Sequence, residues 1–83
     1  MEDHPRHDLN FIKLRIIRFL KDSRYGRSTY EIEDQLKEPL YLIRKALREL
    51  KQERKADWYA VWYECNAGYK RVYRLLDKYG TMI

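Results

Sequence analysis

The helix-start and helix-break residues in the middle of the chain constrain its fold more than any other feature. Ser28 and Glu31, three residues apart, form a capping box that opens a helix, whereas Pro39 cannot continue one. The segment between them therefore has room for one short helix, ending near Leu36. Pro39 also suits the first position of a following helix, so a third helix is expected over residues 40–55.

The segment before the capping box has the pattern of an amphipathic helix. Asp8 is a suitable N-cap, and Ser23 begins a turn that ends at Gly26, so this helix is expected to stop near Asp22. Its apolar residues recur at helical spacing and form one stripe: Leu9, Ile12, Ile16, Phe19 and Leu20.

The segment after the third helix has the pattern of a β-hairpin. Residues 58–65 and 69–76 are rich in aromatic and β-branched side chains, and a three-residue loop between them ends in Gly68. The predicted fold class is therefore α+β, with three helices followed by a C-terminal two-stranded hairpin. We expect a loose N-terminal arm over residues 1–8, one domain over residues 9–76 and a tail over residues 77–83.

Length and composition exclude several classes of protein. A chain of 83 residues makes one small domain that buries about 60% of its unfolded surface, which leaves little room for a deep catalytic cleft. The single cysteine, Cys65, excludes an intramolecular disulfide and a multi-cysteine zinc site. No apolar run approaches the ~20 residues that span a bilayer, so we expect no membrane partner and a cytoplasmic location.

Catalytic and metal-binding chemistry is not expected either. His4 and His7 lie in the loose arm with a proline between them, and two ligands alone make a weak metal site. Asp57 and Glu64 are carboxylates without a pocket or a nucleophile. The three glycines are isolated and form no phosphate-binding loop. We therefore expect no enzyme activity, cofactor, metal or small-molecule ligand.

The order of these elements resembles the winged helix-turn-helix domain of transcription regulators. The residues that carry the resemblance are Ser28-Thr29-Tyr30-Glu31-Ile32, Leu36, Pro39, Ile43-Arg44-Lys45-Ala46-Leu47 and Leu50, and the hairpin with Gly68 would be the wing. The resemblance covers residues 9–76 and implies that the helix at 40–55 enters the major groove of DNA. One departure is the sequence after that helix, where Arg54 and Lys55 stand in place of the glycine found in many such domains.

The third predicted helix carries cations and acids on different sides. Projected at about 100° per residue from Leu40, its cationic and polar side chains lie at about 40° to 140° from Leu40, on a different stripe from the apolar residues, and its acids lie at about 160° to 220°. Opposite charges on a solvated helix usually alternate and pair, so the sorting indicates an external anion; a solvated basic face without a partner is the alternative. The apolar stripe comprises Leu40, Ile43, Leu47 and Leu50, the basic stripe Tyr41, Arg44, Lys45, Arg48, Gln52 and Lys55, and the acidic side Glu38, Glu49 and Glu53.

The resemblance assigns roles to these and to other basic residues. Tyr41, Arg44, Lys45 and Arg48 would face bases, with Arg44 the best candidate for a bidentate contact to guanine. Phosphates would be met by Arg27, Lys55, Lys70 and Arg71, the last two at the wing. Ser28 and Thr29 precede the second helix, where free N–H groups attract anions, although capping is the simpler role for Ser28.

The hairpin is apolar on both of its predicted faces. If Cys65 pairs with Tyr69, one face holds Tyr59, Val61, Tyr63 and Tyr73, and the other holds Trp58, Ala60, Trp62 and Val72. Packing in the core accounts for one face. The other face needs a partner, a covering tail or a role in stacking on bases.

Apolar residues also lie outside the expected core. Phe11 and Leu14 project away from the stripe of the first helix, and Leu76 and Tyr79 follow the hairpin. These four residues are the predicted dimerisation surface of a twofold dimer whose recognition helices meet successive major grooves about 34 Å apart. The alternative is that the tail folds back over Phe11 and Leu14.

The sequence thus predicts a double-stranded DNA-binding protein, a small transcriptional regulator that acts as a possible homodimer. The alternative is a protein–protein interaction module that uses the aromatic hairpin or the surface of the first helix. Such a module would associate without strong dependence on salt and would have an apolar hot spot.

Overall fold

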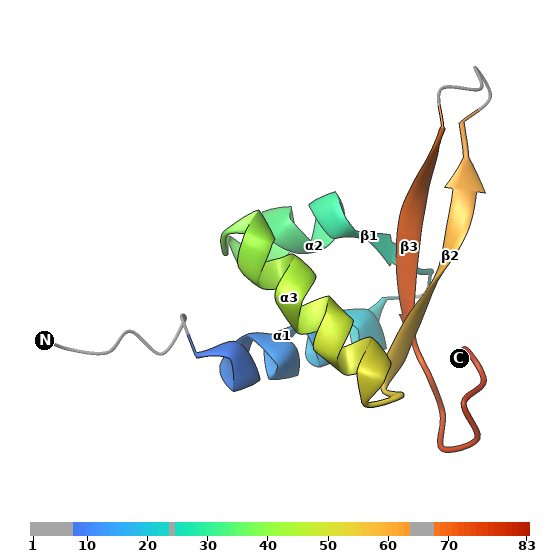
Figure 1. The fold of residues 1–83 in the computed structure, drawn as a ribbon, viewed down its shortest axis with the longest axis horizontal. Helices are drawn as coiled ribbons and strands as arrows, with labels where there is room; N and C mark the ends of the chain where they lie inside the picture. The colour runs from blue at the N-terminus through green and yellow to red at the C-terminus, as the bar shows by residue number, and fades with distance from the viewer. Residues whose placement is uncertain (1–7, 24, 64–67) are drawn as a thin grey trace, which may run out of the picture.

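The computed structural model describes residues 8–23, 25–63 and 68–83, which form an α+β arrangement of three helices and one three-stranded antiparallel sheet. The elements follow in the order α1 (Leu9–Asp22), β1 (Arg27–Ser28), α2 (Thr29–Leu36), α3 (Leu40–Gln52), β2 (Ala56–Trp62) and β3 (Tyr69–Leu75). The helices lie to one side of the sheet, and the β2–β3 hairpin extends beyond them (Figure 1). The predicted arm lies outside the described residues except for Asp8.

The predicted starts of the first two helices are confirmed. The Asp8 side chain accepts a hydrogen bond from the Asn10 N–H at 3.0 Å, and α1 ends at Asp22. At α2 the capping box is complete, because the Ser28 hydroxyl accepts from the Glu31 N–H while the Glu31 carboxylate accepts from the Ser28 N–H. These bonds satisfy N–H groups that the first turn of a helix leaves without partners.

The connection between α2 and α3 buries a charged residue. Glu38 is 4% exposed, and its carboxylate pairs with the Arg15 guanidinium of α1 at 3.0 Å, while a second nitrogen of Arg15 donates to the Leu36 carbonyl oxygen. Glu38 therefore fixes the turn against α1. Its expected place on the acidic side of the third helix is wrong, because α3 begins at Leu40 with Pro39 as N-cap.

Helix α3 ends three residues before the predicted boundary. The last residue is Gln52, and Arg54 adopts a left-handed conformation with φ of 61°. The Lys55 N–H then donates to the Leu50 carbonyl oxygen and the Arg54 N–H to that of Lys51, a pattern that closes helices at a left-handed residue. Lys55 thus lies in the loop after α3, and its expected position on the basic stripe is wrong.

The sheet contains a strand that the sequence patterns did not predict. Strand β1 pairs with β3 on the side opposite to β2, so the strand order is β1-β3-β2. Gly26 permits this approach, since a Cβ at that position would lie 2.3 Å from the Val72 side chain. A short strand made by residues 27–28 thereby attaches the start of α2 to the hairpin.

The register of the hairpin differs from the expected one. Trp62 lies opposite Tyr69, and the Tyr63 N–H donates to the Gly68 carbonyl oxygen. The expected pairing of Cys65 with Tyr69 across a three-residue turn is therefore wrong; residues 64–67 themselves lie outside the described part of the chain.

The corrected register also changes which residues of β2 and β3 share a face of the hairpin. A shift of one strand by an odd number of residues moves each of its side chains to the other face. Tyr73 shares a face with Trp58, and Val72 shares a face with Tyr59. The Trp58 face is the inner one, since Ala56 and Tyr73 are buried in the core and Trp58 packs against it.

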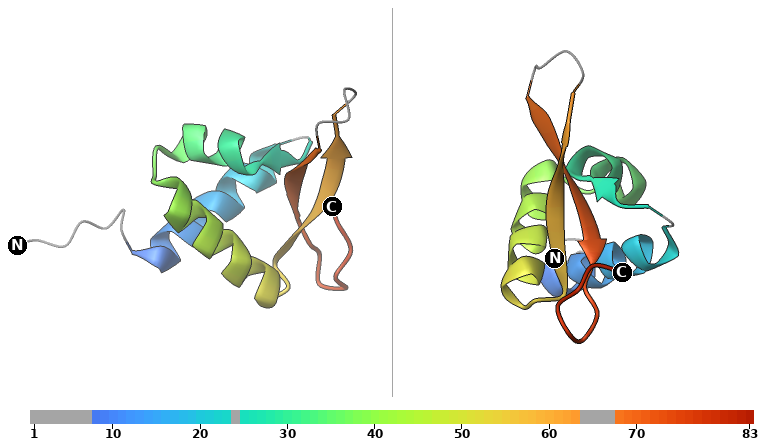
Figure 2. Two further views of the ribbon diagram at one scale, coloured as in Figure 1. Left: turned by 45° about the horizontal axis from the view of Figure 1, so that its top comes forward. Right: turned by 90° about the vertical axis from the view of Figure 1, so that its right-hand side faces the viewer.

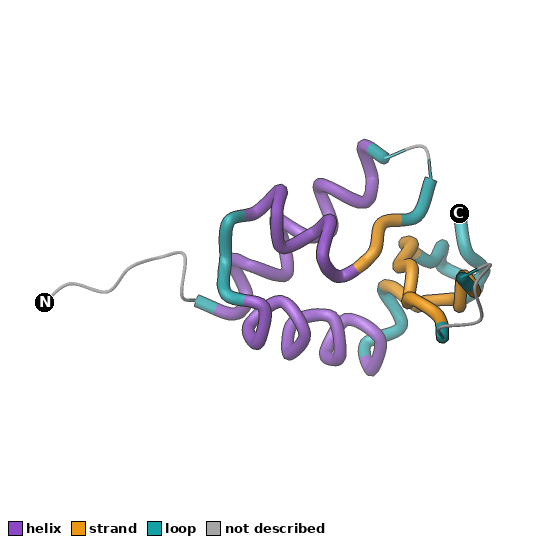
Figure 3. The backbone as a smooth tube through the Cα atoms, turned by 90° about the horizontal axis from the view of Figure 1, so that it is seen from above, coloured by secondary structure: helices purple, strands orange, loops and turns teal. Residues whose placement is uncertain are grey.

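The core lies between the three helices and this inner face (Figures 2 and 3). Its fully buried large side chains come from all three helices: Ile12, Ile16, Ile32, Ile43, Leu47 and Leu50. Each such side chain contributes about 1.5 to 3 kcal/mol on burial. The core thus fixes α3 against the other helices while leaving its opposite side exposed.

The tail turns back on the end of the hairpin rather than over α1. Leu76 forms a bridge with Met82, and the Ile83 N–H donates to the Leu75 carbonyl oxygen. Leu14 remains 64% exposed, so the alternative in which the tail covers Phe11 and Leu14 is wrong. Among the described residues, no helix has the length and apolarity to cross a membrane.

Candidate functional site

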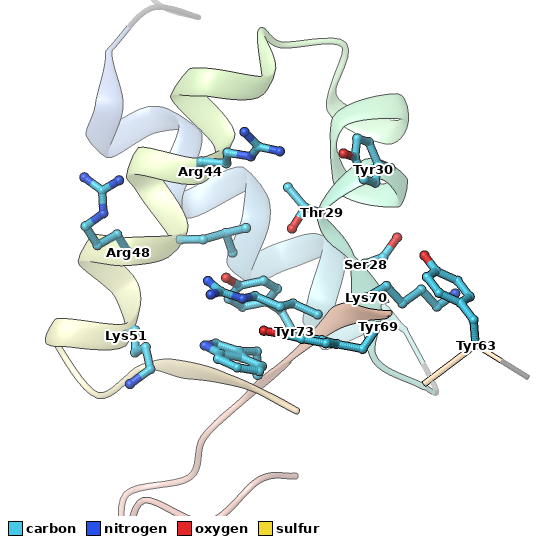
Figure 4. A pocket seen from close by; sticks show the side chains of 13 residues that line it. Ser28, Thr29, Tyr30, Arg44, Arg48, Lys51, Tyr63, Tyr69, Lys70 and Tyr73 are labelled. Carbon is cyan, nitrogen blue, oxygen red and sulfur yellow. The ribbon is translucent and has the colours of Figure 1, made fainter. Parts of the chain in front are cut away.

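A groove of about 470 Å³ runs between the start of α2, one side of α3 and the β2–β3 hairpin (Figure 4). The start of α2 contributes Ser28, Thr29 and Tyr30, α3 contributes Arg44, Leu47, Arg48 and Lys51, and the hairpin contributes Trp58, Tyr63, Tyr69, Lys70, Arg71 and Tyr73. In Figure 4, Arg44 extends from α3 toward α2, whereas the Arg48 guanidinium points away from α2. Three separate elements therefore present side chains to one concave surface.

The groove is strongly basic. Five of its described lining residues are cations, namely Arg44, Arg48, Lys51, Lys70 and Arg71. None of the described lining residues is an acid. Like charges gathered in a concavity raise the local positive potential and attract anions. The groove is therefore suited to a ligand with several negative charges.

The acids of α3 are absent from this groove because they face α1. Lys13 of α1 is 9% exposed, and its ammonium lies 3.2 Å from the Glu49 carboxylate and 2.5 Å from that of Glu53. The hydrogen bond with Glu53 raises the pKa of Lys13, and the same bond lowers the pKa of Glu53. Lys13 thus neutralises the acidic side of α3 within the fold.

The basic side of α3 has no comparable internal partner. Within residues 8–23, 25–63 and 68–83, no carboxylate lies within 4 Å of the Arg44, Lys45 or Arg48 side-chain nitrogens. Lys51 has only a distant carboxylate, that of Asp57 at 3.8 Å. The sorting of charge in the sequence therefore has a counterpart in the structure. The acids on one side of α3 form ion pairs within the fold, whereas Arg44, Lys45 and Arg48 on the other side form no such pairs with the described residues.

Six of the predicted DNA-binding residues meet in the groove: Ser28, Thr29, Arg44, Arg48, Lys70 and Arg71. The Ser28 side chain is 5% exposed and is used by the capping box, so Thr29 and the following N–H groups are what the start of α2 offers to an anion. Tyr41, Lys45 and Gln52 are exposed on α3 outside the groove lining.

Arg27 and Lys55 lie elsewhere. The Arg27 guanidinium donates to the Ser23 hydroxyl at 3.0 Å, lies 3.8 Å from the Glu31 carboxylate and covers the Phe19 ring. Lys55 is 3.7 Å from Glu53. Both predicted phosphate contacts are therefore outside the groove and partly neutralised.

Sequence reasoning missed Lys51 and the aromatic lining. Lys51 projects about 20° from Leu40, between the apolar stripe and Arg44 at about 40°, so the helical projection left it outside the basic stripe. The rings of Tyr63, Tyr69 and Tyr73 line the groove, but their placement depends on the hairpin register, which the sequence predicted wrongly.

The predicted dimerisation residues do not form one surface. Leu14 lines a shallow groove of about 330 Å³ with Leu50 and Glu53, and Leu76 lines an adjoining groove of about 310 Å³. Ile17 and Lys55 border both grooves. Phe11 lies under the Arg15 guanidinium instead, and Tyr79 is exposed in the tail beside Lys78.

In the described parts of the chain, no cluster of three or more His, Cys, Asp or Glu residues could hold a metal ion. His4, His7, Glu64 and Cys65 lie outside those parts. No protein-family model matches this chain, and no curated protein is significantly similar to it.

Proposed function

We propose that this protein is a winged helix-turn-helix domain that binds double-stranded DNA and acts as a small transcriptional regulator. The observation that carries the proposal is the basic groove, where, among the residues that the structure describes, five cations and no acid line a surface made by α2, α3 and the hairpin. In this assignment α3 is the recognition helix and the β2–β3 hairpin is the wing.

Three features of α3 support its role in the major groove. The helix is 13 residues long, its apolar side is fixed by the core, and its opposite side presents Arg44 and Arg48, which pair with no carboxylate of the described residues. A major groove about 12 Å wide accepts an α-helix, and an arginine there can donate two hydrogen bonds to guanine. Arg44 and Arg48 are the residues to which we assign base contacts.

The remaining elements supply contacts to the DNA backbone. Lys70 and Arg71 lie on the hairpin, and Thr29 and Tyr30 lie in the first turn of α2. The N–H groups in the first turn of a helix favour negative charge. Such contacts give affinity and orientation, whereas base contacts give sequence preference.

The test is the salt dependence of binding to duplex DNA, measured by fluorescence anisotropy. With about four to six phosphates neutralised, the logarithm of the association constant should fall with the logarithm of salt with a slope of about −4 to −5. Binding that is absent at low salt, or that does not change with salt, would show that the basic groove is solvated surface only.

A second candidate role is association through the surface of α1, as a homodimer or with another protein. It is favoured by the exposure of Leu14, at 64%, beside two adjoining grooves. Sedimentation equilibrium of the wild type and of Leu14→Glu tests it. A dimer that Leu14→Glu dissociates would support this role, and a monomer at all concentrations, both with and without DNA, would exclude the dimer.

A further inference from the structure

Three aromatic rings form a row along the inner face of the hairpin. The Trp58 and Tyr69 rings are nearly parallel, with an interplanar angle of 11° and centroids 6.3 Å apart, and the Trp62 ring is 4.9 Å from that of Tyr69. Trp58 packs against the core, whereas Tyr69 is 42% and Trp62 is 68% exposed. The row therefore begins at the core and becomes more exposed toward the end of the hairpin.

The exposed part of this row is not needed to cover the helices. The hairpin extends past α2 in Figure 1, and the part of its inner face that closes the core is formed by Ala56, Tyr73 and Leu75 near its base. Tyr69 and Trp62 lie at the opposite end of the paired strands. The Tyr69 ring lines the groove, and the exposed Trp62 ring lies beside it, just outside the groove lining.

Cations adjoin the row on the same hairpin. The Arg71 guanidinium lies 4.4 Å from the centroid of the Trp58 ring and covers one face of that ring. Lys70 also lines the groove. A hydrogen bond with Tyr73 raises the pKa of Arg71, so its positive charge is kept. The exposed ring surface of the row is consequently that of Tyr69 and Trp62, which contact each other, with positive charge beside it.

Aromatic side chains beside cations fit the two parts of a nucleotide. The ring of any base can stack on an aromatic side chain, and its phosphate can pair with a cation. Bases inside an intact duplex are already stacked on one another, so their faces are not accessible. Exposed rings in and beside a basic groove therefore match bases that are unpaired.

We propose that Tyr69 and Trp62 stack on unpaired bases, so that the preferred ligand is duplex DNA that continues into a single-stranded extension. This inference rests on the proposed function, since α3 would hold the duplex part and the hairpin would hold the extension. Lys70 and Arg71 would contact backbone phosphates where the duplex continues into the extension, so they would serve both parts of the ligand.

The experiment compares four DNA ligands by fluorescence anisotropy at one salt concentration. They are a blunt duplex, the same duplex with a short oligo(dT) extension at its 3′ end or at its 5′ end, and the extended strand alone. One stacked base should strengthen binding of one extended duplex over the blunt duplex about tenfold, equivalent to about 1.4 kcal/mol.

Variants of the hairpin assign this effect to the aromatic row. Tyr69→Ala and Trp62→Ala should each bring the ratio of the affinities for the extended and the blunt duplex close to one, whatever their effect on the blunt duplex itself. Tyr69→Phe should retain it because the ring remains. Tyr59→Ala is the matched control, since Tyr59 is 40% exposed but lies on the outer face of the same hairpin.

The results that would contradict the stacking inference can be told apart from those that would contradict the proposed function. Equal affinity for blunt and extended duplexes would overturn this inference and leave the proposed function standing. Binding of the single strand as tight as that of the extended duplex would overturn both, because the duplex would then contribute nothing, and absence of binding to every ligand would do the same. An equal loss in Tyr59→Ala would overturn the assignment to the inner face.

Discussion

The two sides of α3 carry charges of opposite sign and have different environments. Glu49 and Glu53 face α1, where the nearly buried ammonium of Lys13 holds both carboxylates. Arg44 and Arg48 face the groove and have no carboxylate within 4 Å in the described part of the chain. The difference shows that the sorted charges have a structural role on one side and are available to a ligand on the other.

The largest expected effect is a difference in the free energy of unfolding between variants of two adjacent residues of α3. Ile43→Ala should lower the free energy of unfolding by about 2 to 5 kcal/mol, because Ile43 is fully buried and its truncation leaves a cavity. Arg44→Ala should change it by less than about 0.5 kcal/mol, since the side chain is exposed. Urea denaturation measures both values, and similar losses in the two variants would contradict the division of α3 into a core side and a ligand side.

The next effect is on DNA binding. Arg44→Ala should weaken binding to a preferred duplex by about 1 to 3 kcal/mol and relax the preference at one base pair. Lys70→Ala should weaken all duplexes about equally and reduce the salt slope by about 1, since it contacts phosphate. Anisotropy titrations against a panel of single-base variants distinguish the two, and identical behaviour of the two variants would refute separate roles for α3 and the hairpin.

A pH effect is expected on the acidic side of α3. The lowered pKa of Glu53 means that its pairing stabilises the fold above the ordinary glutamate value of 4.5, and that this contribution is lost as pH falls through the lowered pKa. The raised pKa of Lys13 means that its contribution is present below the ordinary lysine value of 10.5 and is lost as pH rises through the raised pKa.

Thermal unfolding of the wild type and of Lys13→Met across pH measures this pair. The difference in stability between the two proteins should be constant between these limits and shrink on both the acid and the alkaline side. A difference that does not change with pH would show that Lys13 stabilises α3 through packing of its alkyl chain alone.

The smallest expected effect concerns the end of α3. Arg54 holds a φ of 61°, a conformation that glycine adopts without the steric cost paid by other residues. Arg54→Gly should therefore raise the free energy of unfolding by about 0.5 to 1 kcal/mol. A loss of stability in urea denaturation would indicate that the Arg54 side chain stabilises the helix end more than its backbone strain destabilises it.

The helices of this protein were predictable because their boundaries depend on neighbouring residues. The Asp8 cap and the capping box of Ser28 and Glu31 act within a few residues and have their expected roles, and Pro39 lies between α2 and α3 as the N-cap of α3, one position before its expected place as the first helical residue. The left-handed Arg54 was not predictable, since arginine has no particular preference for that conformation.

The sheet was less predictable because its pairings join distant parts of the chain. Strand β1 has only two residues and exists because Gly26 allows a close approach to Val72, 46 positions later in the printed sequence. The hairpin register depends on the connection at residues 63–68, and its error reversed the expected partners of Tyr73. The basic side of α3 could therefore be predicted from the sequence, whereas the position of the aromatic residues of the hairpin that line the same groove could not.

The most direct test of the account is duplex binding by two double variants with equal net charge. Arg44→Ala with Arg48→Ala and, as the control, Arg18→Ala with Lys21→Ala each remove two exposed cations, so the net charge of +5 becomes 5 − 2 = +3 in both. We expect the α3 variant to lose salt-dependent binding to duplex DNA and the α1 variant to keep most of it. An equal loss in both variants would contradict the account, because binding would then follow total charge rather than the basic side of α3.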